Sequence, residues 1–220
     1  MSMNNPTVHP DDVLLSAFSA ASLPLSQALC VSTHIEHCHD CRQKTQRLNH
    51  VGSELMQQLK PAAPSAGLKQ QLLDSLDELS DSPVMQASGD PSIPRCLHQF
   101  INTDYSRLAW KRVSPDIYSV ELCRDSNGAK VELLKIRPGG RANTHTHLGD
   151  EYTVVLEGSF SDEDGLYHRG DFMVKDSTDK HTPVATLDQE CICLAVTEGP
   201  IQFTGLINRL LNPLIRRSYN

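Results

Sequence analysis

The hydrophobic pattern of the chain changes once, near residues 80–95, and this change restricts the fold to two differently built domains. Before it, apolar residues recur every three or four positions, as in HPDDVLLSAFSAAS, which predicts helices. After it, short runs such as AKVELLKIRPG and EYTVVLEGSF end in turn residues, which predicts strands. The intervening SDSPVMQASGDPSIPR has the composition of a linker.

The helical part has three further features. The segment LSQALCVSTHIEHCHDCRQKTQRLNHVGSELMQQL reads as one or two helices, and PAAPSAG breaks the pattern. A last amphipathic segment, 68–79, places Leu68, Leu72, Leu76 and Leu79 on one face. These few helices leave one apolar face for a partner. Beyond the linker, several closely spaced strands predict an all-β sandwich or barrel, and 201–217 is expected to add a strand and a short helix.

Composition limits the class of protein. A chain of 220 residues with 39% hydrophobic and 21% charged residues is typical of a soluble protein, and no apolar run is long enough to span a bilayer. The N-terminus has no basic, apolar signal sequence, so we expect a cytoplasmic protein without a membrane partner. The net charge of −7 lies mostly in the first 90 residues, which disfavours direct binding to nucleic acid. An acidic surface suits either a basic protein partner or simple solubility.

The stretch THIEHCHDC, residues 33–41, predicts a first metal site. On a helix over 28–48, His34, Cys38 and Cys41 would project from one stripe. Tetrahedral zinc needs a fourth ligand, and His9 at the start of the first helix is the expected donor. Such a closed site would be structural.

Two further histidines lie in the same stretch. His37 stands at the edge of the stripe as a competing ligand, whereas His39 faces away and is expected to be solvated. The alternative interpretation of the stretch is a pair of structural or redox cysteines beside surface histidines.

A second cluster follows in G-x5-H-x-H-x3-E-x6-G, from Gly139 to Gly158. On a strand, His145 and His147 point to the same face, and Glu151 at the next bend adds a carboxylate. His181 is the expected fourth ligand. Three imidazoles and one carboxylate leave coordination positions open, which suits a divalent metal: zinc first, with manganese, iron or nickel as alternatives. The competing interpretation is a barrel whose pocket is filled or free of metal.

Seven cysteines are an odd number, and in a reducing compartment they favour metal or redox chemistry over disulfides. Cys191 and Cys193 share one face of a predicted strand, as either a redox pair near the second metal site or small buried side chains. Cys30, Cys96 and Cys123 are expected to be core or incidental residues, and Trp110 is expected at the domain edge.

These motifs resemble two known domains. The pattern H-x-x-x-C-x-x-C with an upstream histidine, over residues 9–80, is similar to the zinc-binding anti-sigma domain. The second cluster resembles the first cupin motif. The second cupin motif keeps only Gly165, Gly170 and His181, without the usual Asn three residues later. Together the two domains resemble the ChrR family of anti-sigma factors nearly end to end.

The resemblance implies a non-enzymatic regulator with a helical anti-sigma domain over 1–85, a linker over 86–95 and a cupin domain over 96–220. In that family the first domain binds an extracytoplasmic-function sigma factor and blocks its access to RNA polymerase. The cupin is needed for the response to singlet oxygen and organic hydroperoxides. Two alternatives stay open: a cupin enzyme, such as a dioxygenase, with a zinc assembly module, and a zinc-redox switch whose cupin only stabilises it.

Overall fold

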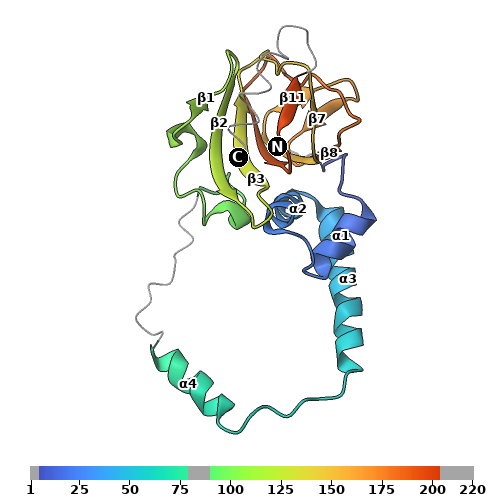
Figure 1. The fold of residues 1–220 in the computed structure, drawn as a ribbon, viewed down its shortest axis with the longest axis vertical. Helices are drawn as coiled ribbons and strands as arrows, with labels where there is room; N and C mark the ends of the chain where they lie inside the picture. The colour runs from blue at the N-terminus through green and yellow to red at the C-terminus, as the bar shows by residue number, and fades with distance from the viewer. Residues whose placement is uncertain (1–4, 79–89, 204–220) are drawn as a thin grey trace.

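A computed structural model describes residues 5–78 and 90–203 of the chain (Figure 1). The predicted C-terminal strand begins within this part, as β11 (Ile201–Phe203), while the short helix expected after it lies outside the described residues.

Four helices form the N-terminal part, as the hydrophobic pattern predicts. They are α1 (Asp12–Ser19), α2 (Leu25–His37), α3 (His39–Gln57) and α4 (Leu68–Glu78). The Asp11 carboxylate caps α1 by accepting a hydrogen bond from the Leu14 backbone N–H at 2.7 Å.

The continuous helix assumed over 28–48 is wrong. Cys38 adopts an extended conformation, with φ −108° and ψ 113°, and separates α2 from α3. Its sulfur accepts a hydrogen bond from the Cys41 N–H at 3.4 Å and so caps α3. The chain turns here because Cys38 serves as the C-cap of one helix and the N-cap of the next.

The C-terminal part is a barrel of antiparallel strands in three sheets. The largest has the order β1-β2-β3-β10-β5-β8, and smaller sheets pair β11 with β4 and order β7-β6-β9. The strands are β1 (Lys111–Arg112), β2 (Ile117–Arg124), β3 (Lys130–Ile136), β4 (His145–His147), β5 (Glu151–Glu157), β6 (Ser159–Ser161), β7 (Leu166–His168), β8 (Phe172–Lys175), β9 (Val184–Ala185) and β10 (Cys191–Thr197).

The two faces of the large sheet are both apolar but cover different cores. One face packs inside the barrel against the small sheets, through residues such as Val155, Met173 and Cys193. The opposite face carries Val154, Leu194 and Val196 and packs against the helices. Consequently every residue of β10 is buried, as expected for a strand covered on both sides.

Helix α2 is the element that covers the outer face of the sheet (Figure 1). Leu29 and Val31 of α2 belong to the same core as the sheet residues. Short 3-10 helices over Arg95–Leu97 and Tyr105–Arg107 add to this core. Ile93, within the predicted linker, is buried there too, while the exact domain limits stay a prediction.

The end of α3 and all of α4 extend away from this body (Figure 1). Their apolar side chains are exposed: Val51, Leu55 and Met56 on α3, and Leu68, Leu72, Leu73 and Leu76 on α4. Among the described residues, no helix is both long and apolar enough to cross a membrane. The predicted combination of an α-helical part with an all-β barrel is confirmed.

Shortening a side chain in the core between helices and sheet should cost stability. Leu194 is 0% exposed, so Leu194→Ala should lower the free energy of unfolding by about 2–5 kcal/mol through lost burial and a cavity. Denaturant unfolding of the full chain measures this. Leu187→Ala is the matched control, because Leu187 is 86% exposed and should change stability by less than about 0.5 kcal/mol. Equal losses would contradict this description of the core.

Candidate metal centres

The structure brings His9, His34, Cys38 and Cys41 together, with their ligand atoms all within 4.8 Å of one another. His9 Nδ1 lies 3.4 Å from His34 Nε2, 3.4 Å from the Cys38 sulfur and 3.6 Å from the Cys41 sulfur. A tetrahedral zinc bound by two nitrogens and two sulfurs has edges of about 3.3–3.8 Å. The cluster therefore has the donor types and spacing of a closed zinc site.

The extended residue Cys38 explains how one short segment supplies three of these atoms. His34 comes from the last turn of α2, Cys38 from the junction, and Cys41 from the first turn of α3. The structure thus brings the four predicted residues together, although the single helical stripe used to select them does not exist. His37 is not part of the cluster, and His39 is exposed, as expected.

Burial controls the protonation of this cluster. Burial, and next the neighbouring Cys38, raise the pKa of the Cys41 thiol to about 12. Burial also lowers the pKa of His34 to about 4, so its imidazole is neutral at pH 7. A cation bound here must displace the thiol proton, which makes its affinity pH-dependent.

The second cluster joins His145, His147, Glu151 and His181 inside the barrel, and all four residues are buried. His181 Nε2 lies 3.1 Å from His145 Nε2 and 3.2 Å from His147 Nε2. Glu151 Oε2 lies 3.2 Å from His147 Nε2 and 3.7 Å from His181 Nε2. His145 and His147 come from β4, and Glu151 begins β5.

Hydrogen bonds on the far side of two rings fix which nitrogen carries the proton. His145 Nδ1 donates to the Asn143 carbonyl at 2.7 Å, and His181 Nδ1 donates to the Asp162 carboxylate at 3.3 Å. The Nε2 lone pairs of these rings therefore face each other. Because two such lone pairs repel at 3.1 Å, a cation between them satisfies both. The residues present fit a divalent metal.

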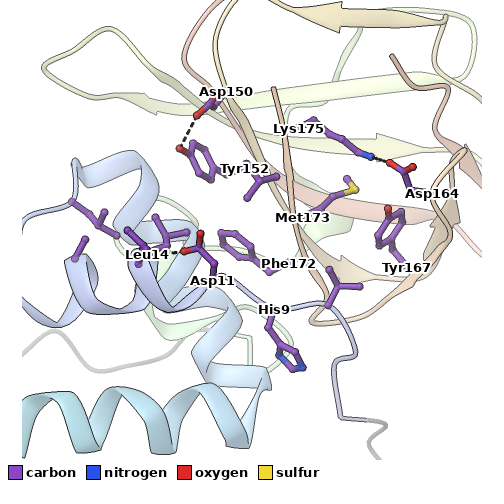
Figure 2. Close-up of a pocket in the computed structure, with 15 residues that line it drawn as sticks. His9, Asp11, Leu14, Asp150, Tyr152, Asp164, Tyr167, Phe172, Met173 and Lys175 are labelled. Carbon is purple, nitrogen blue, oxygen red and sulfur yellow. Dashed lines mark hydrogen bonds and ion pairs between the residues drawn. The ribbon is translucent and has the colours of Figure 1, made fainter. Parts of the chain in front are cut away.

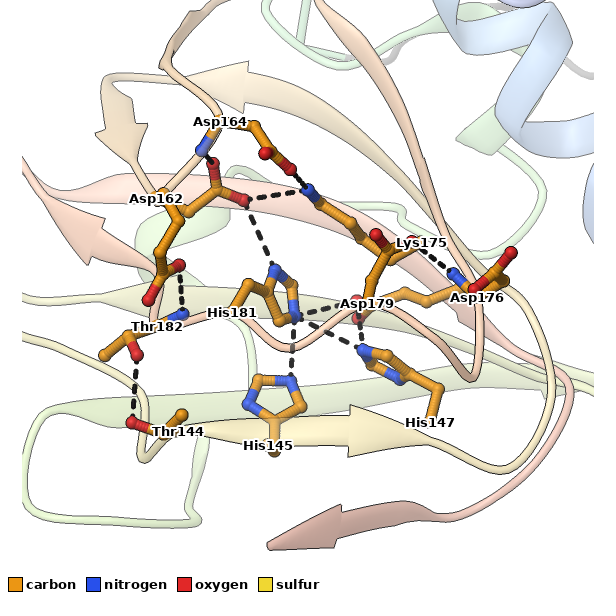
Figure 3. A network of polar contacts seen from close by, with 12 residues as sticks. Thr144, His145, His147, Asp162, Asp164, Lys175, Asp176, Asp179, His181 and Thr182 are labelled. Atoms are coloured by element: carbon orange, nitrogen blue, oxygen red, sulfur yellow. Dashed lines mark hydrogen bonds and ion pairs between the residues drawn. The ribbon is translucent and has the colours of Figure 1, made fainter. Parts of the chain in front are cut away.

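Asp162 is held in turn by Lys175 (Figure 3). Its carboxylate lies between the His181 ring and the Lys175 ammonium, 3.3 Å from Nζ. Lys175 also contacts Asp164. Although burial lowers the pKa of Lys175, the hydrogen bond to Asp164 and the charge of Asp162 raise it on balance. The ammonium thus stays charged in the barrel and keeps Asp162 in place beside His181.

Burial shifts the pKa values of the other two members of the cluster, His147 and Glu151. Burial lowers the pKa of His147 to about 3 and raises the pKa of Glu151 to about 7. His147 Nδ1 is buried and has no hydrogen-bond partner among the described residues. A bound cation would favour the carboxylate form of Glu151 and compensate the cost of burying it.

Cys191 and Cys193 lie on the face of β10 that points into the barrel, with their sulfurs 3.7 Å apart and both thiols free. The hydrogen bond with Cys191, and next burial, raise the pKa of Cys193 well above its usual value. Since the thiolate is the reactive form, the raised pKa of Cys193 favours the interpretation of small core side chains over that of a redox pair. His168 is exposed, Cys30 is buried, and Cys96, Cys123 and Trp110 are half-buried.

Sequence reasoning missed Asp162 and Lys175. Asp162 stands in the acidic run DEDG, which reads as an ordinary polar turn. Lys175 ends a predicted strand, where a charged residue is expected to face solvent, yet its side chain is only 5% exposed. A lysine at an inward-facing position of β8, two residues after the inward-facing Met173, was the available signal.

Fold and site together define a cupin protein that carries a helical module with a two-cysteine, two-histidine cluster. Residues 98–202 match the ChrR cupin-like domain family. The chain is 32% identical to the anti-sigma-E factor ChrR of Cereibacter sphaeroides, over 94% of this chain and 97% of that protein. It also matches the crystal structure of Rhodobacter sphaeroides SigE in complex with the anti-sigma ChrR, with a TM-score of 0.74 and 32% identity, over 86% of this chain and 98% of that one.

The protein belongs to the ChrR family of anti-sigma factors. This confirms the resemblance found in the two motifs. It also confirms the prediction of a regulator over that of a cupin enzyme.

Removing the carboxylate behind His181 should weaken metal binding in the barrel. Asp162→Asn leaves His181 Nδ1 without its charged acceptor, and loss of such a contact weakens metal affinity about 10–100-fold. Competition with a chromogenic chelator, performed on the full chain, measures this. The control Asp188→Asn changes an exposed carboxylate away from the cluster and should titrate like the unaltered protein. An unchanged affinity for Asp162→Asn would show that Asp162 does not orient a ligand.

Proposed function

We propose that this protein binds an extracytoplasmic-function sigma factor through its helical domain and keeps it from RNA polymerase in the cytoplasm. Family membership supports this, since the matched crystal structure is a complex of ChrR with SigE. The observation in this chain that carries the proposal is the exposed apolar surface of α3 and α4, which no described residue covers.

This surface has the character of a partner interface. Val51 and Leu55 are four residues apart on α3, and Leu68, Leu72 and Leu76 recur every four residues on α4. Each set therefore lies on one side of its helix. Short helices such as α4 gain most of their stability from packing. Contiguous exposed apolar residues mark interaction sites. A sigma factor packed against both helices would bury them.

The proposed role of the first cluster is structural. His9, His34, Cys38 and Cys41 would hold zinc and fix the angle between α2 and α3, which meet at Cys38. Zinc is proposed here because two thiolates and two imidazoles are typical ligands of closed zinc sites.

The cupin is proposed to sense oxidative stress, as singlet oxygen or hydroperoxide, through His145, His147, Glu151 and His181 and a second divalent metal. Zinc is the first candidate, with manganese, iron and nickel as alternatives. The metal would supply an open coordination position, and the barrel residues hold their lone pairs toward it. A loss of about 1.4 kcal/mol in binding free energy lowers sigma affinity tenfold, so a small structural change suffices for release.

Charges on the apolar face of α4 should abolish tight sigma binding. Leu72→Glu combined with Leu76→Glu should weaken the complex with an extracytoplasmic-function sigma factor of the same organism by at least about 30-fold, the effect of losing an interface hot spot. Titration calorimetry with the full chain measures this. The control pair Leu166→Glu and Leu187→Glu places the same charges on exposed cupin positions and should bind normally. Normal binding by the α4 variant would exclude this face as the interface.

Variants of the cupin cluster should separate binding from response. Replacing His145 and His147 by Ala changes no residue of the α3 and α4 surface, so sigma affinity should stay within about threefold of the original. Exposure to singlet oxygen from a photosensitiser should dissociate the original complex but not the variant complex, as followed by size-exclusion chromatography. A variant complex that dissociates normally would remove the sensing role from the cupin.

A further inference from the structure

A residue of the cupin domain forms a hydrogen bond with a histidine of the first cluster. His34 Nδ1 lies 2.6 Å from the backbone carbonyl of Gly170, two residues before β8. A carbonyl only accepts hydrogen bonds, so the proton of this ring sits on Nδ1 and the lone pair of Nε2 points at His9 and the cysteines. The acceptor that orients an N-terminal ligand thus comes from the other domain.

The next two residues, Asp171 and Phe172, contact the same cluster and the segment that precedes it. The Phe172 ring packs edge-on against the His34 ring, with centroids 5.8 Å apart. The Asp171 carboxylate accepts hydrogen bonds from the backbone N–H groups of Thr7 and Val8, at 2.6 and 3.0 Å. The Phe172 N–H donates to the Val8 carbonyl at 2.9 Å. The chain that leads into His9 is therefore fixed by the cupin as well.

The contact is too close for a larger residue at position 170. Gly170 has φ +91°, and a Cβ atom there would lie 2.7 Å from Pro6 and 2.9 Å from His37. A glycine is required on both grounds, backbone conformation and space. A pocket of about 640 Å³, lined in part by residues of α1 and β8, includes both His9 and Lys175 in its lining (Figure 2).

The other end of β8 belongs to the second cluster. Lys175, three residues after Phe172, pairs in register with Glu151 and contacts Asp162, the carboxylate behind His181. One short strand therefore has the outer contacts of one metal cluster at its start and those of the other at its end.

We propose that Gly170, Asp171 and Phe172 of the cupin form the outer shell of the N-terminal metal site, and that β8 couples this site to the barrel cluster. The inference rests on the proposed zinc site in the helical domain. Gly170 and Asp171 act as positioning residues: they orient His34 and the segment before His9 and touch no metal. A change at the barrel cluster reaches the helices through β8.

Cobalt(II) titration of the full chain tests this, because only the N-terminal cluster has sulfur ligands and gives a thiolate-to-cobalt charge-transfer band. Gly170→Ala should weaken cobalt binding measured from this band about tenfold or more, the usual effect of losing an outer-shell contact. Asp171→Asn keeps the side-chain size and avoids backbone strain, and it should also weaken cobalt binding. Gly165→Ala is the matched control, since nothing lies within 4 Å of a Cβ there, and it should titrate normally.

A third variant tests the coupling. Glu151→Gln alters only the barrel cluster, and we expect it to weaken the thiolate-band titration at least about threefold. Normal titrations for Gly170→Ala and Asp171→Asn would overturn the outer-shell role. A normal titration for Glu151→Gln, with the other two weakened, would overturn the coupling. If the unaltered protein gives no thiolate band, the proposed metal site itself is wrong and the inference falls with it.

Discussion

The packing of α2 against the outer face of the large sheet is the interaction on which the rest of the structure depends. It closes a core that neither domain completes alone, since Leu29 and Val31 on the helix meet Val154 and Leu194 on the strands. With its outer face covered, β10 is buried throughout. The same packing positions the last turn of α2 so that His34 reaches the backbone carbonyl of Gly170, just before β8. The position of the first metal cluster follows from this core.

Most members of the two clusters could be predicted from the sequence because they lie close together in the chain, whereas His9 and His181 lie far from the rest. His145 and His147 lie two apart on a strand, and His34, Cys38 and Cys41 lie within eight positions, so spacing alone restricts where their side chains point. The break at Cys38 was not predictable in the same way. Helical periodicity runs through it on both sides, and the extended residue is stabilised by the cap to Cys41 and by the cluster itself.

The contacts behind the ligands were beyond sequence reasoning, because they join residues far apart in the chain. His34 and Gly170 are 136 positions apart, and His181 and Asp162 are separated by 19. Nothing in the local pattern around an RGD or DEDG turn indicates such a partner. The resemblance to a two-domain family predicted that both domains would be present, but not that one supplies hydrogen bonds to the metal cluster of the other.

The three histidines of the barrel cluster differ in how their rings are restrained by hydrogen bonds. Those of His145 and His181 are tethered through Nδ1, to a backbone carbonyl and to a carboxylate, whereas His147 has no such tether among the described residues. Rotation of the His147 ring breaks no hydrogen bond at Nδ1 and disturbs only the contacts of Nε2 with Glu151 and His181. A rearrangement of the cluster therefore costs least at His147, whose outer ring nitrogen is held by no described residue.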